Sequence, residues 1–346
     1  MISPGAALAG RVVRWQETHG RNSLPWQNTR DPYRVWLSEV MLQQTQVITV
    51  VAYFERFVTR LPDVAALAAA AEDEVLGLWS GLGYYSRARN LHRCAAEVVQ
   101  TWGGKFPRHA AELETLPGIG RSTAAAIASL CFGERVAILD ANVKRVVTRV
   151  LGFTADLASS ANERLLWKAA TGLLPTHDLT ATMRRYTQGM MDLGAMVCHV
   201  RRPACAVCPL ASVCHARRAG TAESFPVKTR KLKRSSQVVW LLWAQTRDGS
   251  VCLQRRPVPG IWAGLYCLPW FDTREDLLAC ISARHRNTTS DREVVKHVLT
   301  HKDVYLHTVQ VQLAPGALDA STGQWFGAEA WPGLGLPAPV RRLLQA

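Results

Sequence analysis

Apolar side chains recur at helical spacing along the first two thirds of the chain, up to about residue 222. This period predicts helices over 34–48, 64–79, 86–101, 122–132 and 142–151, with Gly and Pro between them. The first of these helices has a recognisable start, because Asp31 is a favoured N-cap residue and Pro32 suits the first helical position. We therefore expect residues 1–222 to form an all-α domain.

The pattern changes in the last third, where short β-branched and aromatic runs are separated by Asp-Gly and Pro-Gly turns. Strands are expected over 238–245, 250–256 and 303–313, with one helix near 273–285. The basic, non-amphipathic segment before them predicts a linker over 223–235. We therefore expect a multidomain protein whose second, smaller domain, 236–346, is α+β.

The composition fits a folded protein with a polyanionic partner. Of the 346 residues, 48% are hydrophobic and 20% charged, and the formal net charge is +14. Such an excess favours nucleic acid or an anionic membrane surface, although a generally basic proteome would also produce it. We expect no membrane association and no secretory signal, because neither a long apolar run nor a basic segment leading into one is present. A cytoplasmic protein is predicted.

Four of the nine cysteines are crowded together at Cys198, Cys205, Cys208 and Cys214. Thiolates at this spacing can converge on one metal centre, and the run has only one C-x-x-C pair. It therefore favours an iron–sulfur cluster over zinc without excluding zinc. The other five cysteines are predicted to be buried thiols in a reducing compartment. Arg201 and Arg202 in the loop could contact phosphates, or could simply face solvent.

A second candidate is the turn Leu116-Pro117-Gly118-Ile119-Gly120, which precedes the helical run RSTAAAIASL. The two glycines would leave backbone N–H groups facing outward, and the helix would add its positive N-terminal end with a cap from Ser122 or Thr123. Together these groups could bind one phosphate of a nucleic-acid backbone. An ordinary turn between helices has the same pattern.

Two carboxyl groups stand in distinctive surroundings. Glu39 lies within an otherwise apolar helical run, where burial would raise its pKa and suit it to be a general acid. Asp140 closes the apolar run VAILD just before a helix, where it should stay ionised and face developing positive charge. One raised and one lowered carboxyl pKa is the pairing that glycosidic bond cleavage uses. Alternatively, Glu39 is an exposed helix residue and Asp140 an ordinary N-cap.

The chain resembles the adenine DNA glycosylases of the MutY type, in the helix-hairpin-helix superfamily. The matching segments cover nearly all of the first 220 residues in order: LPW (24–26), DPYRVWLSEVMLQQTQV (31–47), GLGYYSRARNLH (81–92), LPGIGRSTA (116–124), ILDANVKRV (138–146), MMDLGAMVC (190–198) and the cysteine run. The resemblance implies that the four cysteines hold a [4Fe–4S] cluster. It also implies a monomeric enzyme that flips adenine, paired with 8-oxoguanine or guanine, out of double-stranded DNA.

The resemblance assigns further roles to residues of this chain. Glu39 would protonate the adenine at N7 and help to activate water, Asp140 would stabilise the oxocarbenium-like sugar, and Asn142 would assist it. The positions that line the adenine pocket in relatives are Trp26, Leu42, Ser122 and Asp192, and those that enter the base stack are Gln43, Gln44 and Tyr84. Relatives that also cut the strand carry a lysine where this chain has Ser122, so a monofunctional enzyme is expected.

The second domain resembles the Nudix-like module of the same family. Its segment after Gly264 lacks the glutamates of catalytic Nudix domains, so nucleotide hydrolysis is not expected. By resemblance, the domain would read 8-oxoguanine through a Phe-Ser-His loop. Here the loop is Leu299-Thr300-His301, which keeps the hydroxyl and imidazole and loses the aromatic ring. A second departure is Asn22, where relatives often carry Lys or Arg.

Three other functions compete with this one. An endonuclease III-like lyase acting on oxidised pyrimidines would share the hairpin, Asp140 and the cysteine run, but is disfavoured by Ser122, Glu39 and the second domain. A catalytically silent lesion sensor would have little reason to keep two costly carboxyl groups in an apolar pocket. An active Nudix hydrolase is disfavoured by its missing glutamates.

Overall fold

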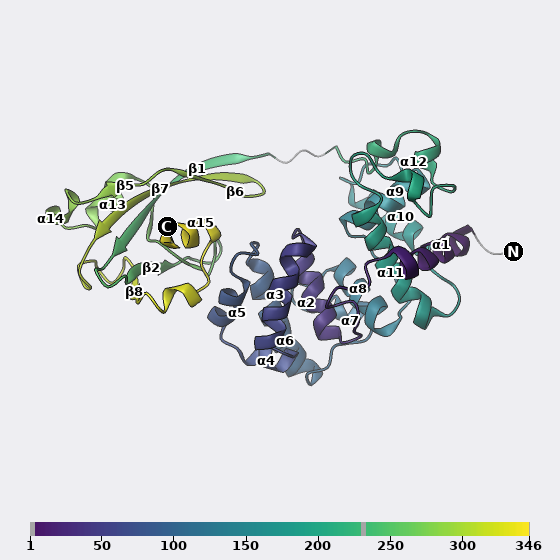
Figure 1. Ribbon diagram of the computed structural model, residues 1–346, viewed down its shortest axis with the longest axis horizontal. Helices are drawn as coiled ribbons and strands as arrows, with labels where there is room; N and C mark the ends of the chain where they lie inside the picture. Colours follow the sequence, from purple (N-terminus) through teal and green to yellow (C-terminus); the bar gives the residue numbers. More distant parts are fainter. Residues whose placement is uncertain (1–3, 230–232, 346) are drawn as a thin grey trace. The chain divides into compact units, whose positions relative to one another are not determined.

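The computed structural model describes residues 4–229 and 233–345, which form two compact units (Figure 1). The first unit comprises Met1–Ala68 and Arg93–Arg230, and the second comprises Ala69–His92 and Lys231–Ala346. Residues 69–92 thus group with the C-terminal sequence, although they lie within the predicted helical domain. The predicted boundaries at 222 and 236 remain a prediction, and residues 230–232 of the linker lie outside the described residues.

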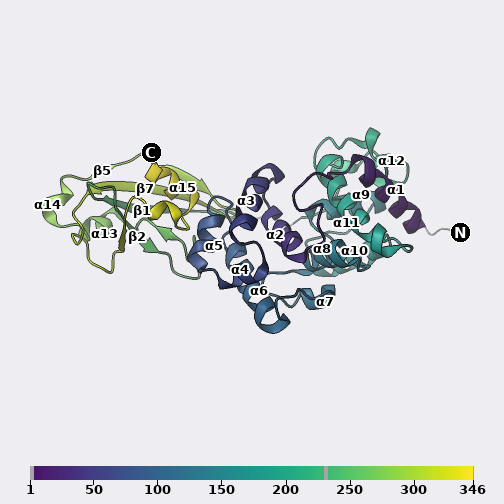
Figure 2. The ribbon, with the colours of Figure 1, turned by 60° about the horizontal axis from the view of Figure 1, so that its bottom comes forward.

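The first unit is helical, as predicted. It contains α1 (Pro4–His19), α2 (Pro32–Leu42), α3 (Val47–Arg60), α4 (Val64–Ala69), the greater part of α6 (Ser86–Trp102), α7 (Ala110–Leu113), α8 (Arg121–Phe132), α9 (Ala141–Leu151), α10 (Ser160–Thr171), α11 (Leu179–Met196) and α12 (His215–Arg218), with 3-10 turns at Cys205–Val207 and Ala222–Ser224. Figure 2 shows α1 lying along α11, which also packs against α8 and α9.

Two of the predicted helices are interrupted. The helix expected over 34–48 ends at Leu42, and α3 begins at Val47. Between them Gln44 takes a left-handed backbone conformation with φ 59°, which an L-residue adopts only at a cost of about 1–2 kcal/mol. The helix expected over 64–79 divides into α4 and α5 (Glu72–Trp79). In contrast, the start of α2 is confirmed: Asp31 is the N-cap and accepts from the Tyr33 N–H at 3.0 Å.

One core cluster of the first unit lies between α1, α8, α9, α10 and α11. Close approach of these helices depends on glycine at Gly194, because a Cβ there would come within 2.5 Å of the Asn142 Cβ. At the other end of α11, Gly133 follows α8 with φ 73° and packs against the Thr180 backbone. The C-terminal half of α11 therefore lies beside the start of α9, and its N-terminus lies beside the end of α8.

The second unit is built on one mixed sheet. Its strands are β1 (Ser235–Gln245), β2 (Val251–Arg255), β3 (Tyr266–Cys267), β4 (Trp270–Phe271), β5 (Ser290–Asp291), β6 (Val295–Val298), β7 (Lys302–Gln312) and β8 (Gln324–Phe326). The long strands β1 and β7 are parallel neighbours over their whole length, from Ser235 opposite Lys302 to Gln245 opposite Gln312 (Figure 1). The three strands expected from the sequence are confirmed.

Short helices complete the second unit: α5, the first turns of α6, α13 (Arg274–Ala279), α14 (Ala283–Arg286), a 3-10 turn at Trp331–Gly333 and α15 (Ala338–Gln345). The single helix expected near 273–285 is thus two helices, separated by Cys280–Ser282. Residues 69–92 belong to this unit through side-chain contacts, since Tyr85 and Ser80 both donate to the Leu336 carbonyl, at 2.8 and 3.0 Å. Within the described ranges, no helix has the length and apolar character needed to cross a membrane.

Candidate active site

Glu39 lies on the wall of a cavity of about 480 Å³ in the first unit. The cavity is bounded by α1, α2, the segment 21–30, the end of α8 and the first half of α11. Its lining residues are Gln16, Glu17, Arg21, Asn22, Trp26, Gln27, Asn28, Thr29, Arg30, Val35, Ser38, Glu39, Leu130, Ala181, Arg184, Arg185 and Gln188. This volume is within the range of small-molecule sites, so a single nucleobase fits with room to spare.

Glu39 is poised to act as an acid at neutral pH. Burial raises the pKa of its carboxyl group to about 7, the nearby Asp140 raises it further, and the Arg21 guanidinium opposes both. Its carboxyl group accepts no hydrogen bond from the described residues, so both oxygens are available to a ligand. The prediction of a raised pKa is therefore confirmed, and the alternative of a freely exposed Glu39 is wrong, because the residue is more than half buried.

Asp140 does not have the lowered pKa that the sequence suggested. It is the N-cap of α9 and accepts from the Val143 N–H at 2.7 Å, but burial outweighs this bond and raises its pKa above the usual value. Arg145 and Lys144 act in the opposite direction. Position at a helix N-terminus favours the charged form, yet desolvation of a half-buried carboxylate is the larger effect here. The pKa values of both carboxyl groups are therefore raised, and that of Glu39 lies at about 7.

Asn142 is fixed in the first turn of α9. Its Oδ1 accepts from Arg145 Nη2 at 2.8 Å, and the same arginine donates to the carbonyls of Gly194 and Cys198 at 2.6 and 2.7 Å. The side chain of Arg145 is almost fully buried in this position. The start of α9, which carries both Asp140 and Asn142, is thus tied to α11 and to the first residue of the cysteine run.

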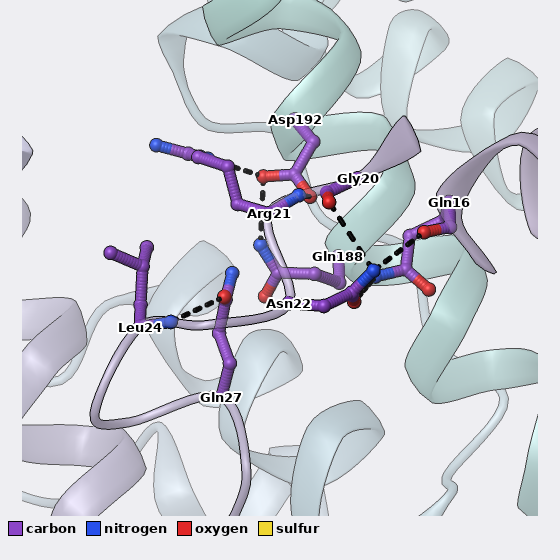
Figure 3. A network of polar contacts seen from close by, with 8 residues as sticks. All are labelled: Gln16, Gly20, Arg21, Asn22, Leu24, Gln27, Gln188 and Asp192. Carbon is purple, nitrogen blue, oxygen red and sulfur yellow. Dashed lines mark hydrogen bonds and ion pairs between the residues drawn. The ribbon is translucent and has the colours of Figure 1, made fainter. Parts of the chain in front are cut away.

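Asp192 does not line the cavity, although the resemblance assigned it there. It is completely buried and accepts from the backbone N–H and the Nε of Arg21, at 3.0 and 2.7 Å (Figure 3). Gln188 Nε2 donates to the same carboxylate at 3.0 Å. Arg21 and Gln188 do line the cavity, so Asp192 acts by holding these two side chains in place.

Asn22 closes the end of α1 rather than contributing charge. Its Nδ2 donates to the carbonyls of Gln16 and Gly20 at 3.1 and 3.2 Å, and its Oδ1 accepts from Gln16 Nε2 at 2.7 Å (Figure 3). These bonds satisfy carbonyl groups that a helix end otherwise leaves unpaired. A lysine or arginine could not accept the bond from Gln16, which gives the departure at Asn22 a structural role.

Of the remaining predicted pocket residues, Trp26 lines the cavity, whereas Leu42 and Ser122 do not. Trp26 is 6% exposed and packs edge-to-face against Phe54. Leu42 is the last residue of α2, and the Ser122 hydroxyl accepts from the Leu139 N–H at 3.2 Å, which places it next to Asp140.

The hairpin before α8 has the predicted geometry but not the predicted cap. Gly118 has φ 75° and is exposed with Gly120, whereas Ile119 between them is buried. The N–H groups of both glycines donate no backbone hydrogen bond among the described residues, so they are free for a phosphate. The N-cap of α8 is Gly120 and no side chain caps it, so the expected cap from Ser122 or Thr123 is wrong. An uncapped helix start leaves its N–H groups open to an anion.

Two of the three residues expected to enter the base stack, Gln44 and Tyr84, are exposed, whereas Gln43 is partly buried. Gln44 and Tyr84 are both left-handed, with φ of 59° and 48°, and such strain in L-residues is concentrated at functional sites. Gln43 is the C-cap of α2, and its Nε2 donates to the Thr123 hydroxyl at 3.4 Å. In the second unit, the Tyr84 hydroxyl is hydrogen-bonded to Thr300 Oγ1 at 2.9 Å.

Thr300 and His301 lie in the exposed turn between β6 and β7, not within a strand. The turn is closed by the Leu299 N–H, which donates to the Lys302 carbonyl at 2.8 Å. Arg234 Nη1 donates to the Thr300 carbonyl at 2.7 Å and fixes the turn against the start of β1. The contact between Tyr84 and Thr300 brings together two predicted lesion-contacting residues that are far apart in sequence.

Cys198, Cys205, Cys208 and Cys214 line one pocket, which α9 also lines through Val146, Arg149 and Val150. Arg149 is 1% exposed and donates to Cys198 Sγ at 3.2 Å and to the carbonyls of His199 and Val200. Such a donor stabilises thiolate ligands, so the residues fit a thiolate-bound cofactor. Among the described residues, no three His, Cys, Asp or Glu side chains lie close enough together to hold one metal ion as they stand. Arg201 and Arg202 are both exposed on the loop, as a phosphate contact requires.

Sequence reasoning missed most of the cavity residues, among them Arg21, Gln188 and Arg184. A signal for the first two was present, because the acidic Asp192 lies in an otherwise apolar helical segment and needed partners. Arg184 carried no such signal. It donates to the carbonyls of Gln27 and Thr29, and so holds the loop that forms one cavity wall.

Comparison with known proteins gives a consistent result over both units. Residues 37–171 match the family described as HhH-GPD superfamily base excision DNA repair protein, and residues 238–346 match the NUDIX domain family. The adenine DNA glycosylase of Buchnera aphidicola subsp. Baizongia pistaciae is 34% identical over 96% of this chain and 94% of its own length. The human adenine DNA glycosylase is 42% identical over 62% of this chain and 40% of its own length.

Among solved structures, a thermostable thymine-DNA glycosylase is similar with a TM-score of 0.54 and 27% identity. The match covers 62% of this chain and 97% of that protein. An endonuclease III–DNA complex matches with a TM-score of 0.50 and 24% identity over 62% of this chain and 94% of the other, and supports the fold alone. The all-α and α+β classes expected from the sequence are therefore confirmed.

Proposed function

The chain belongs to the adenine DNA glycosylases, and we propose that it removes adenine mispaired with 8-oxoguanine or guanine in double-stranded DNA. The enzyme hydrolyses the N-glycosidic bond in base excision repair. The observation that carries the proposal is Glu39, a half-buried acid with a pKa of about 7 and no hydrogen-bond partner among the described residues, on the wall of a cavity that can hold a nucleobase. It would act as a monomer on nucleoid DNA in the cytoplasm.

In the proposed mechanism, Glu39 protonates the flipped adenine at N7 and so improves the leaving group. A carboxyl group with a pKa near 7 is well matched to this step, because enough of it is protonated at neutral pH. As the bond between N9 and C1′ breaks, positive charge develops on the sugar and stabilises the ionised form of Asp140. Asn142 supports that carboxylate from the same helical turn. Glu39, now ionised, helps to activate the water that attacks C1′.

The absence of strand cleavage follows from Ser122. A lyase needs an amine that forms a Schiff base with the sugar, and the Ser122 hydroxyl supplies none. Among the described residues that line the cavity there is no lysine, and Lys144 beside Asp140 is paired with Glu163. These positions favour hydrolysis with an intact strand over the endonuclease III-like lyase reaction.

Recognition of the opposite base is proposed for the exposed turn of Thr300 and His301. The Tyr84 hydroxyl bond supports this role, because it joins the turn to a residue expected in the base stack. DNA is the substrate, and its backbone would be held by the free N–H groups of Gly118 and Gly120 and by Arg201 and Arg202. A single-turnover assay with adenine opposite 8-oxoguanine, guanine or thymine tests this specificity. Free adenine is expected from the first two duplexes only.

We propose that Cys198, Cys205, Cys208 and Cys214 hold a [4Fe–4S] cluster. Their spacing, their shared pocket and the Arg149 donor to Cys198 support it. When bound, the cluster would organise the loop that carries Arg201 and Arg202. The protein's own contribution is the thiolates, the Arg149 donor and the apolar wall from Leu210.

Replacing Cys208 by serine should abolish cofactor binding. We expect protein purified without oxygen to lose most of its iron and sulfide and to bind duplex DNA about tenfold more weakly, because the arginine-bearing loop loses its anchor. Iron and sulfide content, visible absorption and DNA binding measure the effect. Cys280→Ser is the matched control, because its thiol donates to the Leu277 carbonyl as a serine hydroxyl can. Full iron content in Cys208→Ser would contradict the ligand assignment.

A further inference from the structure

The cavity that Glu39 lines has a volume of about 480 Å³, which is more than a single flipped base needs. If the proposed function is correct, one end of this cavity receives the adenine, and the other end has no assigned role. We propose that the far end is a release route through which the excised adenine leaves, and water enters, while the abasic DNA is still bound. The route would open away from the DNA-binding hairpin.

Three helices give the direction of the route. Along α2, Gln43 at the C-terminal end is expected to meet DNA, and the cavity is lined by Glu39, Ser38 and Val35, in order of increasing distance from it. Val35 is eight residues from Gln43, or about 12 Å at 1.5 Å per helical residue. The cavity therefore follows α2 away from the base stack.

The same order holds along α8 and α11. The hairpin and Ser122 are at the start of α8, whereas the cavity is lined by Leu130 near its end. The end of α8 lies against the start of α11, through Gly133 and Thr180, and it is there that Ala181 lines the cavity. All three helices thus place the far end on the side opposite the proposed phosphate site.

The walls of the far end have the polar character needed for a purine base to pass along them. They are polar, and Gln27 presents a buried Nε2 amide that has no hydrogen-bond partner in the described part of the chain (Figure 3). Its Oε1 is already used by the Leu24 N–H at 3.3 Å. This donor is buried, so it can serve the acceptor ring nitrogens of adenine only after the Gln27 side chain turns toward the cavity.

The mouth of the route is formed by exposed residues of α1 and α11. Glu17, Arg185 and Ala181 are all exposed and all line the cavity. Arg185 is paired with Glu17 at 3.3 Å, and both side chains are nearly half exposed. An ion pair this exposed contributes little stability, so it can open without a large barrier. Arg184, anchored to the loop carbonyls, keeps the opposite wall in place.

The first test compares two variants, each with one alanine replaced by tryptophan, in a single-turnover reaction on DNA that carries labelled adenine. Bond cleavage is measured as alkali-labile sites, and adenine release as the label that passes a filter retaining protein and DNA. The DNA that stays bound to the protein is measured in the same sample. In the unmodified protein, adenine should appear at the rate of cleavage while the DNA stays bound. Ala181→Trp should slow adenine release about tenfold relative to the cleavage rate measured in the same sample, because the bulky ring narrows the mouth.

Ala161→Trp is the matched control, since Ala161 is also an exposed alanine in the first turn of a helix and does not line the cavity. Arg185→Ala removes the ion pair at the mouth. Adenine release from this variant should therefore be at least as fast as from the unmodified protein. Adenine that stays with the protein until the DNA dissociates would overturn the proposal, as would equal release rates in Ala181→Trp and Ala161→Trp.

A second test needs no catalysis and separates this proposal from the proposed function. The protein is saturated with duplex DNA that carries a tetrahydrofuran abasic analogue, and the binding rate of free labelled adenine is measured. The rear route predicts that adenine binds to this complex, about tenfold more slowly in Ala181→Trp. Failure of adenine to bind would refute the route. A protein that binds adenine in this complex but forms no alkali-labile sites would keep the route and refute the proposed function.

Discussion

Glu39→Gln is expected to reduce adenine excision by about 10³-fold and to leave DNA binding unchanged, because general acid catalysis contributes about 10²–10⁴ in rate. Glutamine has nearly the shape of glutamate and cannot give a proton to N7. Single-turnover excision and equilibrium binding to an 8-oxoguanine:adenine duplex measure the two effects. Glu55→Gln makes the same charge change on an exposed face of α3 and should retain full activity.

The pH dependence of the unmodified enzyme should follow the same group. Burial holds the pKa of Glu39 at about 7, above its usual value, so the proton donor is present below pH 7 and is lost above it. The rate of excision should therefore fall as the pH rises through 7, by about tenfold per unit where protonation limits the reaction. A rate that stays flat from pH 6 to pH 9, or an active Glu39→Gln variant, would contradict the assigned role.

Asp140→Asn is expected to reduce excision by about 10²–10³-fold with little change in thermal stability. The charge that opposes the developing positive sugar is lost, and such electrostatic stabilisation is worth about this much. Asparagine is as good an N-cap as aspartate, so the bond from the Val143 N–H can be kept. Thermal unfolding and single-turnover excision, measured on the same sample, separate the two roles.

Two further variants sharpen this prediction. Asp31→Asn makes the same change at the N-cap of α2, where the carboxylate is exposed rather than partly buried, and should excise adenine normally. Asp140→Ala should lose the same activity as Asp140→Asn and also about 1 kcal/mol of stability, since alanine cannot cap the helix. If Asp140→Asn retained activity while Asp140→Ala did not, Asp140 would be only a structural cap.

The sequence predicted the parts of the fold that local chemistry determines. The Asp31-Pro32 start of α2, the helix after Gly120 and the strand positions follow from capping, turn and periodicity rules, and all are present. The break at Gln44 was missed because apolar residues continue at helical spacing through it. The left-handed backbone there is a departure from local preference, as is common at a functional site.

The site was predicted in its chemistry and less well in its geometry. The raised pKa of Glu39 follows from its apolar neighbours along the helix. That of Asp140 was predicted in the wrong direction, because the degree of its burial depends on tertiary packing. The role of Asp192 as a partner of Arg21 and the contact of Tyr84 with Thr300 involve residues 171 and 216 positions apart. Periodicity and spacing carry no information on such pairs.

Single-turnover excision from a duplex with one 8-oxoguanine:adenine pair, analysed with and without alkali, tests the proposed function most directly. The structure predicts free adenine and a strand that breaks only after alkali, because Glu39 supplies the acid and Ser122 supplies no amine. Strand breakage without alkali would contradict the hydrolytic mechanism and favour the lyase. Tight binding with no release of adenine would show that the chain is a lesion sensor rather than a glycosylase.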